Sequence, residues 1–386
     1  MIIRVIGLLS AFGTKNIDVF EWSQSNVRKS RLSNNPVWGS LTTTHPQLKL
    51  NGWKLAHAVT KVDYLVERDL LMPSLGFLLQ TDRIFDFSAG NNLRLVPGSA
   101  ATLNDFTRTS LIGRVGQGLS LLFAHSKGYC FVCHLASDAG VASHMASQGK
   151  KLKAADFLFE NDGRERMILE SKASFSQPLN DPTQIKSTLK AALTGQVDYW
   201  MPRITPAASK GFAVLSCLRE TGNVAPSALI FVDPPEQPTR QPIEIPQAQV
   251  RRRNYASWLR AMGLNATARE LLQTSRDGGR NIELPIVRIG PHKFAITGTG
   301  YPDGMFPWWA ERRPWPVAGL EVSALRAISA SLRGEDRPLL DYPGLFADGP
   351  DIDETEIAYG SVFPDGSYFG APDLRRDFVG SESFLL

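Results

Sequence analysis

The sequence is poor in cysteine, in long apolar runs and in net charge. Its three cysteines are an odd number in a chain of 386 residues, which argues against a disulfide framework and fits a reducing compartment. No apolar run approaches the roughly 18 residues needed to cross a bilayer, so no membrane partner is expected. The net charge of +4 is small, so an anionic partner must be met by local basic patches rather than by the whole surface.

The N-terminal segment carries a short apolar run without the features of a leader peptide. Arg4 interrupts the run, and no small-residue cleavage site follows it. We therefore expect residues 2–9 to form a first strand and the protein to be cytoplasmic.

The length and composition predict a globular chain of more than one domain. Hydrophobic residues make up 43% and charged residues 21%, which is ordinary for a folded protein. Prolines crowd a polar stretch after residue 233 and mark a semi-rigid linker. The expected division is an N-terminal accessory domain at 1–100, a core at 101–235 and a C-terminal accessory domain at 236–386.

One stretch, AADFLFENDGRERMILESKAS at residues 154–174, carries the chemistry. Two apolar runs flank an Asn-Asp-Gly turn, which predicts two buried strands folded back on each other. Glu170 and Lys172 lie two residues apart and therefore project to the same face of their strand. Asp156 on the first strand is within reach of both.

Charged residues at the ends of buried strands are costly unless they are paired, hydrogen-bonded or bound to metal. Two carboxylates and an amine on one face can bind a divalent cation and activate water. The pattern thus predicts a metal-dependent nuclease. The alternative is an edge hairpin whose ends reach solvent, with Glu170 and Lys172 as a weak surface pair.

A helix is predicted on each side of this hairpin. In the first, at about 103–126, Gly113, Gly116 and Gly118 each cost about 1 kcal/mol relative to alanine. Something therefore packs closely there, such as the sheet or a substrate backbone, or the helix is a loosely packed core helix. The second helix starts near Asp181, and its apolar stripe consists of Ile185, Leu189, Leu193 and Val197.

The run Cys130-Phe-Val-Cys133-His134 matches the haem attachment pattern letter for letter. On a strand, however, the two cysteines would face opposite sides. A zinc site is equally poor, because no second Cys/His pair follows at finger spacing. Two small buried thiols are the better interpretation.

Asp156, a gap of 13 residues, and then Glu170-Ser171-Lys172 together resemble the PD-(D/E)xK (restriction-endonuclease-like) nuclease superfamily. The resemblance covers about 103–235 and implies an α/β fold, with a mixed central sheet flanked by helices. It implies that Asp156 and Glu170 hold Mg²⁺ or Mn²⁺ and that Lys172 orients the attacking water. Two positions depart from the family pattern.

The first departure is Ala155, which replaces the family's proline. The second is Gln117, which stands where many members offer a glutamate to the metal, so that ligand is neutral or absent here. Gln196, followed by Tyr199, loosely resembles a glutamine–tyrosine motif of some relatives.

Basic residues surround this core. Lys151 and Lys153 precede Asp156, and Lys186 and Lys190 lie one turn apart on the second helix, where they could meet phosphates or simply face solvent. Residues 251–253 are three arginines that open a further helix. They suit a nucleic-acid backbone, although a helix docking through Trp258 is equally compatible.

The resulting hypothesis is a Mg²⁺-dependent endonuclease acting on double-stranded DNA in restriction or anti-phage defence. It would work as a homodimer or with defence-system partner proteins. RNA is an open alternative substrate. The competing hypothesis is a catalytically impaired nuclease-fold protein that serves as a nucleic-acid-binding or assembly module, because Gln117 replaces an acid.

Overall fold

The computed structural model describes most of the chain, namely residues 2–31, 38–66, 81–102, 105–148, 152–175, 182–236, 238, 240–273, 279–298, 316–345 and 359–386. Within these ranges, no helix is both long enough and apolar enough to cross a membrane.

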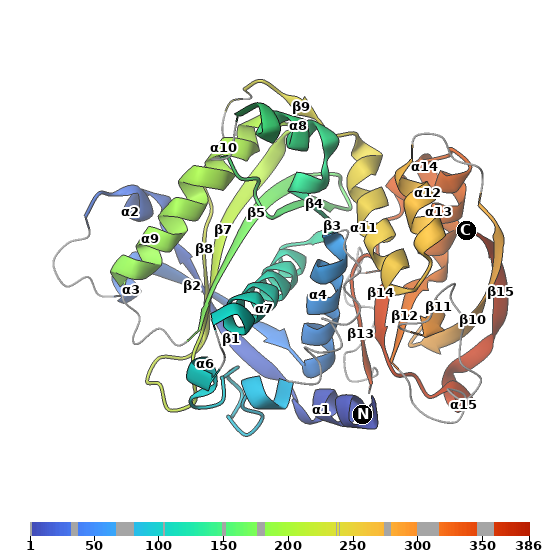
Figure 1. The fold of residues 1–386 in the computed structure, drawn as a ribbon, viewed down its shortest axis with the longest axis horizontal. Coiled ribbons are helices and arrows are strands. Elements are labelled where there is room, and N and C mark those ends of the chain that lie inside the picture. Colours follow the sequence, from blue (N-terminus) through green and yellow to red (C-terminus); the bar gives the residue numbers. More distant parts are fainter. Residues whose placement is uncertain are drawn as a thin grey trace.

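The protein is a mixed α/β structure built on two sheets (Figure 1). The first has the strand order β2-β1-β8-β7-β5-β4-β3, in which β5 is parallel to β7 and β1 is parallel to β8, while the other neighbours are antiparallel. Its strands are β1 (Lys15–Trp22), β2 (Thr42–Leu50), β3 (Tyr129–His134), β4 (Phe157–Asn161), β5 (Arg166–Phe175), β7 (Ala208–Leu218) and β8 (Ala228–Val232).

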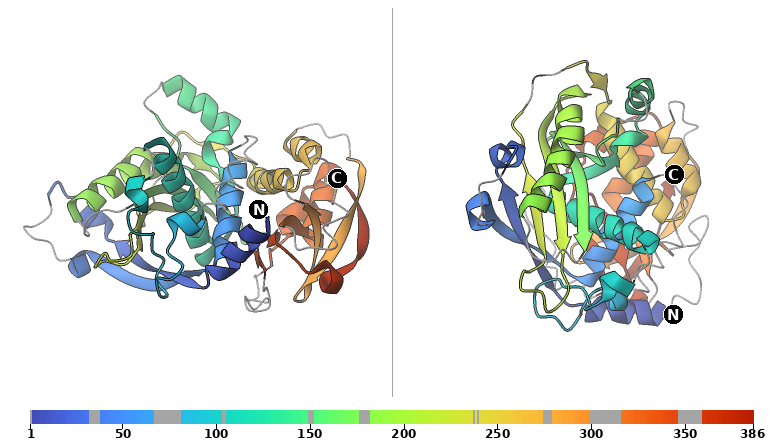
Figure 2. Two further views of the ribbon diagram at one scale, coloured as in Figure 1. Left: turned by 60° about the horizontal axis from the view of Figure 1, so that its bottom comes forward. Right: turned by 60° about the vertical axis from the view of Figure 1, so that its left-hand side comes forward.

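Helices cover both faces of this sheet. On one face, α7 (Asp105–Ser126) packs against α4 (Gly52–Leu65) and against β5, with Leu119 and Leu122 in the larger buried core. On the other face, α9 (Pro182–Ala192) lays its apolar stripe on β7, where Ile185 and Leu189 meet Leu215. The predicted stripe is therefore confirmed, and Figure 2 shows the two helices on opposite sides of the strands.

The second sheet is antiparallel, with the order β13-β14-β12-β11-β10-β15. Its strands are β10 (Asn281–Ile289), β11 (His292–Gly298), β12 (Val317–Glu321), β13 (Gly360–Val362), β14 (Ser367–Gly370) and β15 (Phe378–Leu385). A short parallel ladder joins β6 (Ile204–Thr205) to β9 (Ile243–Glu244).

The remaining described helices and helical turns are α1 (Ile2–Ala11), α2 (Gln24–Arg28), α3 (Trp38–Leu41), α6 (Ser99–Thr102), η1 (Leu135–Ser137), α8 (Ala139–Gln148), η2 (Leu193–Val197), α10 (Asp198–Trp200), η3 (Met201–Arg203), α11 (Gln247–Ala261), α12 (Asn265–Leu272), α13 (Val322–Leu332), α14 (Arg337–Asp341) and α15 (Leu374–Asp377).

Helix α11 lies between the two sheets and binds to both (Figure 1). Arg251 is fully buried and donates to the Glu160 carboxylate on β4 at 2.8 Å. Trp258, also fully buried, donates from Nε1 to the Gly319 carbonyl on β12 at 2.7 Å. The prediction that this helix docks through Trp258 is confirmed, whereas the solvated arginines expected with it are wrong, because Arg251 is buried.

The other two arginines of the basic cluster are also engaged within the protein. Arg252 pairs with Asp336, and Arg253 lies 3.6 Å from the Asp138 carboxylate. The three guanidinium groups therefore hold α11 in place, and the structure does not present them as an open basic surface.

The apolar runs at 2–9 and 83–87 both favour strands, and both predictions are wrong. Residues 2–9 lie in helix α1, because Val5, Leu9 and Phe12 recur at helical spacing and bury one face of it. Residues 81–84 are helical, and Phe85 makes only an isolated bridge to Leu95.

The predicted hairpin and its flanking helices are confirmed. The apolar runs at 129–135, 211–218 and 228–233 also predict strands, and these are confirmed as β3, β7 and β8. The segment 1–100, expected as an accessory domain, contributes β1 and β2 to the first sheet, which therefore crosses the expected boundary at residue 100. Several predicted features lie outside the described residues, namely a strand at 75–80, Lys151, the helix start at Asp181, an aromatic–arginine surface at 306–313 and an acidic loop at 348–356.

The three glycines of α7 occupy different environments. A Cβ at Gly116 would overlap the Cβ of Ala173 on β5, and one at Gly118 would lie 3.0 Å from Val59 Cγ2 on α4. A Cβ at Gly113 would meet nothing within 4 Å. Close packing against the sheet, one of the two predicted reasons for these glycines, is thus confirmed at Gly116.

We expect Gly116→Ala and Gly113→Ala to change stability in opposite directions. The first overpacks the contact between α7 and β5 and should lower the free energy of unfolding by roughly 1–3 kcal/mol. The second adds helix propensity in open space and should raise it by up to about 1 kcal/mol. Urea denaturation of both variants measures the difference, and equal effects would contradict the packing described here.

Candidate active site

Asp156 and Glu170 lie side by side, one rung of the β4–β5 ladder beyond the pair Phe157–Leu169. Each carboxylate accepts a hydrogen bond from the backbone beside the other. The Asp156 N–H donates to Glu170 Oε2 at 3.1 Å, and the Ser171 N–H donates to Asp156 Oδ2 at 2.9 Å. These reciprocal bonds fix both acids at the start of β4.

Lys172 completes the group from the same strand as Glu170. Its ammonium donates to Glu170 Oε1, as expected for residues two apart on one face of a strand. The Lys172 side chain is 38% exposed, whereas that of Glu170 is 1% exposed. The group therefore has a buried acid at its base and an accessible cation at its rim.

Burial and mutual repulsion both act on these acids. Burial is the larger cause and the Asp156 charge the second cause of a Glu170 pKa raised to about 7, against which Lys172 acts. Burial also raises the pKa of Asp156, despite the Ser171 N–H bond and the charge of Lys172. One ammonium does not balance the buried Glu170 carboxylate and the half-buried Asp156 carboxylate, so a further cation would stabilise the charged pair.

The two predicted supporting glutamines reach the site in different ways. Gln117 on α7 donates from Nε2 to Asp156 Oδ1 at 3.5 Å, so it contacts a candidate ligand directly. Gln196 lies on the π-helical turn η2 and donates to the Ala154 carbonyl at 2.7 Å. It therefore positions the backbone that leads into Asp156.

Sequence reasoning missed three residues around the site. Ser120 on α7 is hydrogen-bonded to Ser171 through their hydroxyls at 2.8 Å, and Trp200 donates to the Lys153 carbonyl at 2.8 Å. His134, at the end of β3, has a pKa lowered by burial and partly restored by the nearby Asp156 charge. The sequence singled out only His134 among the three, as part of the haem-like run, and that pattern did not point to the acids.

The cysteines of the haem-like pattern are free thiols. Cys133 is buried and Cys130 half-buried, and burial raises the pKa of each thiol to about 12. Both are therefore protonated near neutral pH and poor metal ligands.

The donor set suits a hard divalent cation. Carboxylate oxygens are the ligands that Mg²⁺ prefers, and it commonly retains several waters beside one or two of them. In the described part of the chain, no group of three or more His, Cys, Asp and Glu side chains is placed to hold a metal. Asp156 and Glu170 are the two residues of this site that could hold such a cation.

The lysines predicted to contact nucleic acid differ in exposure. Lys153 is exposed beside the site. Lys186 is only 6% exposed, and Lys190 is half-buried and donates to the Arg28 carbonyl at 3.4 Å. The α9 lysines thus form a less open surface than their spacing predicted.

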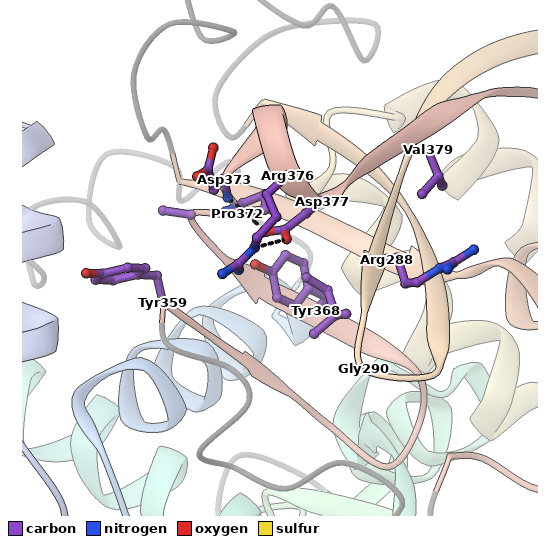
Figure 3. A pocket seen from close by; sticks show the side chains of 11 residues that line it. Arg288, Gly290, Tyr359, Tyr368, Pro372, Asp373, Arg376, Asp377 and Val379 are labelled. Carbon is purple, nitrogen blue, oxygen red and sulfur yellow. Dashed lines mark hydrogen bonds and ion pairs between the residues drawn. The ribbon is translucent and has the colours of Figure 1, made fainter.

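A cavity of about 510 Å³ lies away from this site, on the second sheet (Figure 3). It is lined by Arg288 and Gly290 at the end of β10, by Tyr368 on β14, and by Arg376 and Asp377 on α15. Arg376 is paired with Asp377 at 2.7 Å, and Tyr368 lies beside this pair. No pattern in the sequence pointed to this cavity, because its walls come from distant segments.

We expect Glu170→Gln to remove a pH dependence of stability. A folded-state pKa near 7, above the ordinary value of 4.5, means that the native state binds more protons between these values. Stability from this group is therefore present at low pH and is lost as pH rises from about 4.5 to 7. The free energy of unfolding of Glu170→Gln, relative to that of wild type, should therefore rise by roughly 1–3 kcal/mol between pH 5 and pH 8.

Urea denaturation in chelator-containing buffer measures this gain. Glu165→Gln, at an exposed position of the same hairpin, is the control and should keep the wild-type profile. If the stability of all three proteins depends on pH in the same way, the raised pKa of Glu170 is refuted.

The chain was compared with protein-family models, curated proteins and solved structures, and no match was found in any of the three.

Proposed function

We propose that this protein is a metal-dependent nuclease of the PD-(D/E)xK type that hydrolyses phosphodiester bonds of DNA. The observation that carries the proposal is the reciprocal fixing of Asp156 and Glu170, with Lys172 on the Glu170 carboxylate. Two acids held together in this way retain unbalanced negative charge in a buried place, as a cation site requires.

The order of the elements supports the same proposal. Helix α7, strand β3, the β4–β5 hairpin and helix α9 follow one another in the order that resembles the family, with α8 inserted between β3 and β4. Strands β5 and β7 are parallel neighbours, so α9 crosses over between them and lies beside the face that carries Lys172.

Each residue has a role in this proposal. A bound divalent cation would supply a water of lowered pKa and neutralise charge on the phosphate. Asp156 and Glu170 hold the cation, and Gln117 fixes one Asp156 oxygen. Lys172 presents a compact positive charge where negative charge develops on the reacting phosphate.

A nucleic-acid-binding module without cleavage is the second candidate. It is favoured by the neutral Gln117, which occupies the position next to Asp156 where a third carboxylate would strengthen metal binding. Under either candidate, action in restriction or anti-phage defence and assembly as a homodimer or with defence-system proteins remain part of the proposal.

Plasmid cleavage tests the leading candidate. Wild type should nick or linearise supercoiled DNA with Mg²⁺ or Mn²⁺ and lose this activity with EDTA. Asp156→Asn, Glu170→Gln and Lys172→Met should each lower the rate by about 100-fold or more. A parallel assay on RNA determines whether DNA is the preferred substrate.

Matched controls separate the site from general damage. Two exposed positions serve as controls and should retain activity when changed. They are Glu165→Gln on the same hairpin and Lys210→Met on β7, where Lys210 forms a solvent-exposed ion pair with Asp233 at 3.2 Å. Equal activity of all site variants would overturn the assignment. An inactive wild type that binds DNA, with cleavage gained in Gln117→Glu, would establish the second candidate.

A further inference from the structure

A second cavity, of about 220 Å³, lies next to Lys172. Its walls are two neighbouring strands of the first sheet and the first turns of α9, and the lining residues are Ala173, Ser174, Gln184, Ile185, Thr188, Leu215 and Cys217.

Strand register places this cavity directly beside the candidate site. Lys172 on β5 is the register partner of Leu215 on β7, and Ser174 is the partner of Cys217 one rung pair further along. Because side chains two apart share a face, Ser174 follows Glu170 and Lys172 on the same side of β5. A substrate held at Lys172 would meet the cavity without crossing another element.

The lining is apolar at the base and polar at the rim. Ile185, Leu215 and Cys217 are buried and form the apolar part. Ser174 is half-buried and Gln184 exposed, and neither side chain makes a hydrogen bond to another described residue. These two groups are available to a ligand as donors and acceptors.

The absence of charge decides which part of a nucleic acid fits. None of the lining residues in the described chain is ionisable except Cys217, whose thiol pKa is raised to about 11 by burial. A phosphate would find no cation here, whereas a base offers an apolar face and polar edges. The volume is below the roughly 300–1,000 Å³ of sites for drug-sized ligands, so it suits one nucleoside.

We propose that this cavity receives the base of a single nucleotide next to the scissile phosphate, and that the preferred substrate is therefore unpaired at that position. A base inside a duplex is stacked and paired, so it enters such a cavity only from a single strand or after flipping out. This inference rests on the proposed function, because it takes Lys172 as the position of the phosphate.

The first test changes the substrate and leaves the protein intact. Oligonucleotides carry one abasic residue, moved to each position flanking the cut, and are used as single strands and annealed to a complementary strand. The inference predicts that one position raises KM by about fivefold or more and that the single-stranded form is cleaved better than the duplex. Less than a twofold effect at every position would overturn it.

The second test fills the cavity. Thr188→Phe introduces a ring into the lining, and the adjacent Ser187→Phe places the same ring on the exposed face of α9. In the wild type, both hydroxyls donate to the Gln184 carbonyl. The two variants therefore lose the same kind of hydrogen bond and differ in where the ring is placed. Thr188→Phe should raise KM and abolish the abasic effect, and Ser187→Phe should leave both unchanged.

Binding separates failure of this inference from failure of the proposed function. The abasic series is repeated by fluorescence anisotropy with Glu170→Gln, which needs no catalysis. Metal-dependent cleavage that no abasic position changes refutes the proposed role of the cavity and leaves the nuclease proposal standing. Position-dependent binding without cleavage by wild type refutes the nuclease and keeps the nucleoside cavity, and neither binding nor cleavage refutes both.

Discussion

The burial of Asp156 and Glu170 side by side is the constraint on which the rest of the structure depends. Two acids bonded to each other's backbone cannot move apart without breaking the start of the β4–β5 ladder. Burial first, and the Asp156 charge second, raise the Glu170 pKa to about 7, and Lys172 offsets this only in part. A structure that served stability alone would gain by replacing such a pair with apolar residues, so we infer that the pair is kept for its chemistry.

The rest of the molecule holds this pair rigidly. Helix α7 lies close to β5 because Gly116 has no side chain, and it brings Gln117 and Ser120 to the hairpin. Glu160, at the other end of β4, is anchored to α11 by the buried Arg251. Through α11 and the buried pair between Lys61 and Asp365, the second sheet is packed onto the first.

Local patterns in the sequence predicted much of this arrangement. The apolar runs and the Asn-Asp-Gly turn predicted the hairpin, and alternation predicted that Glu170 and Lys172 share a face. The contacts that could not be predicted join distant segments. Nothing in the sequence around Arg251 indicates that this residue pairs with Glu160. An arginine that faces solvent would have the same neighbours in the sequence.

Local sequence patterns also failed to predict how deeply some side chains are buried. The spacing of Lys186 and Lys190 predicted an open cationic face, but burial depends on what packs over α9. The apolar run at 2–9 shows the same limit, because a short run fits a strand or a buried helix face until its partner, here α4, is known.

Crystals soaked in Mn²⁺ test the central claim most directly, because Mn²⁺ is located by its anomalous scattering. The account predicts one strong peak coordinated by oxygens of both Asp156 and Glu170, and no peak there in crystals of Glu170→Gln. Wild-type crystals without a peak between the two carboxylates, at Mn²⁺ concentrations that saturate other nucleases, would contradict it.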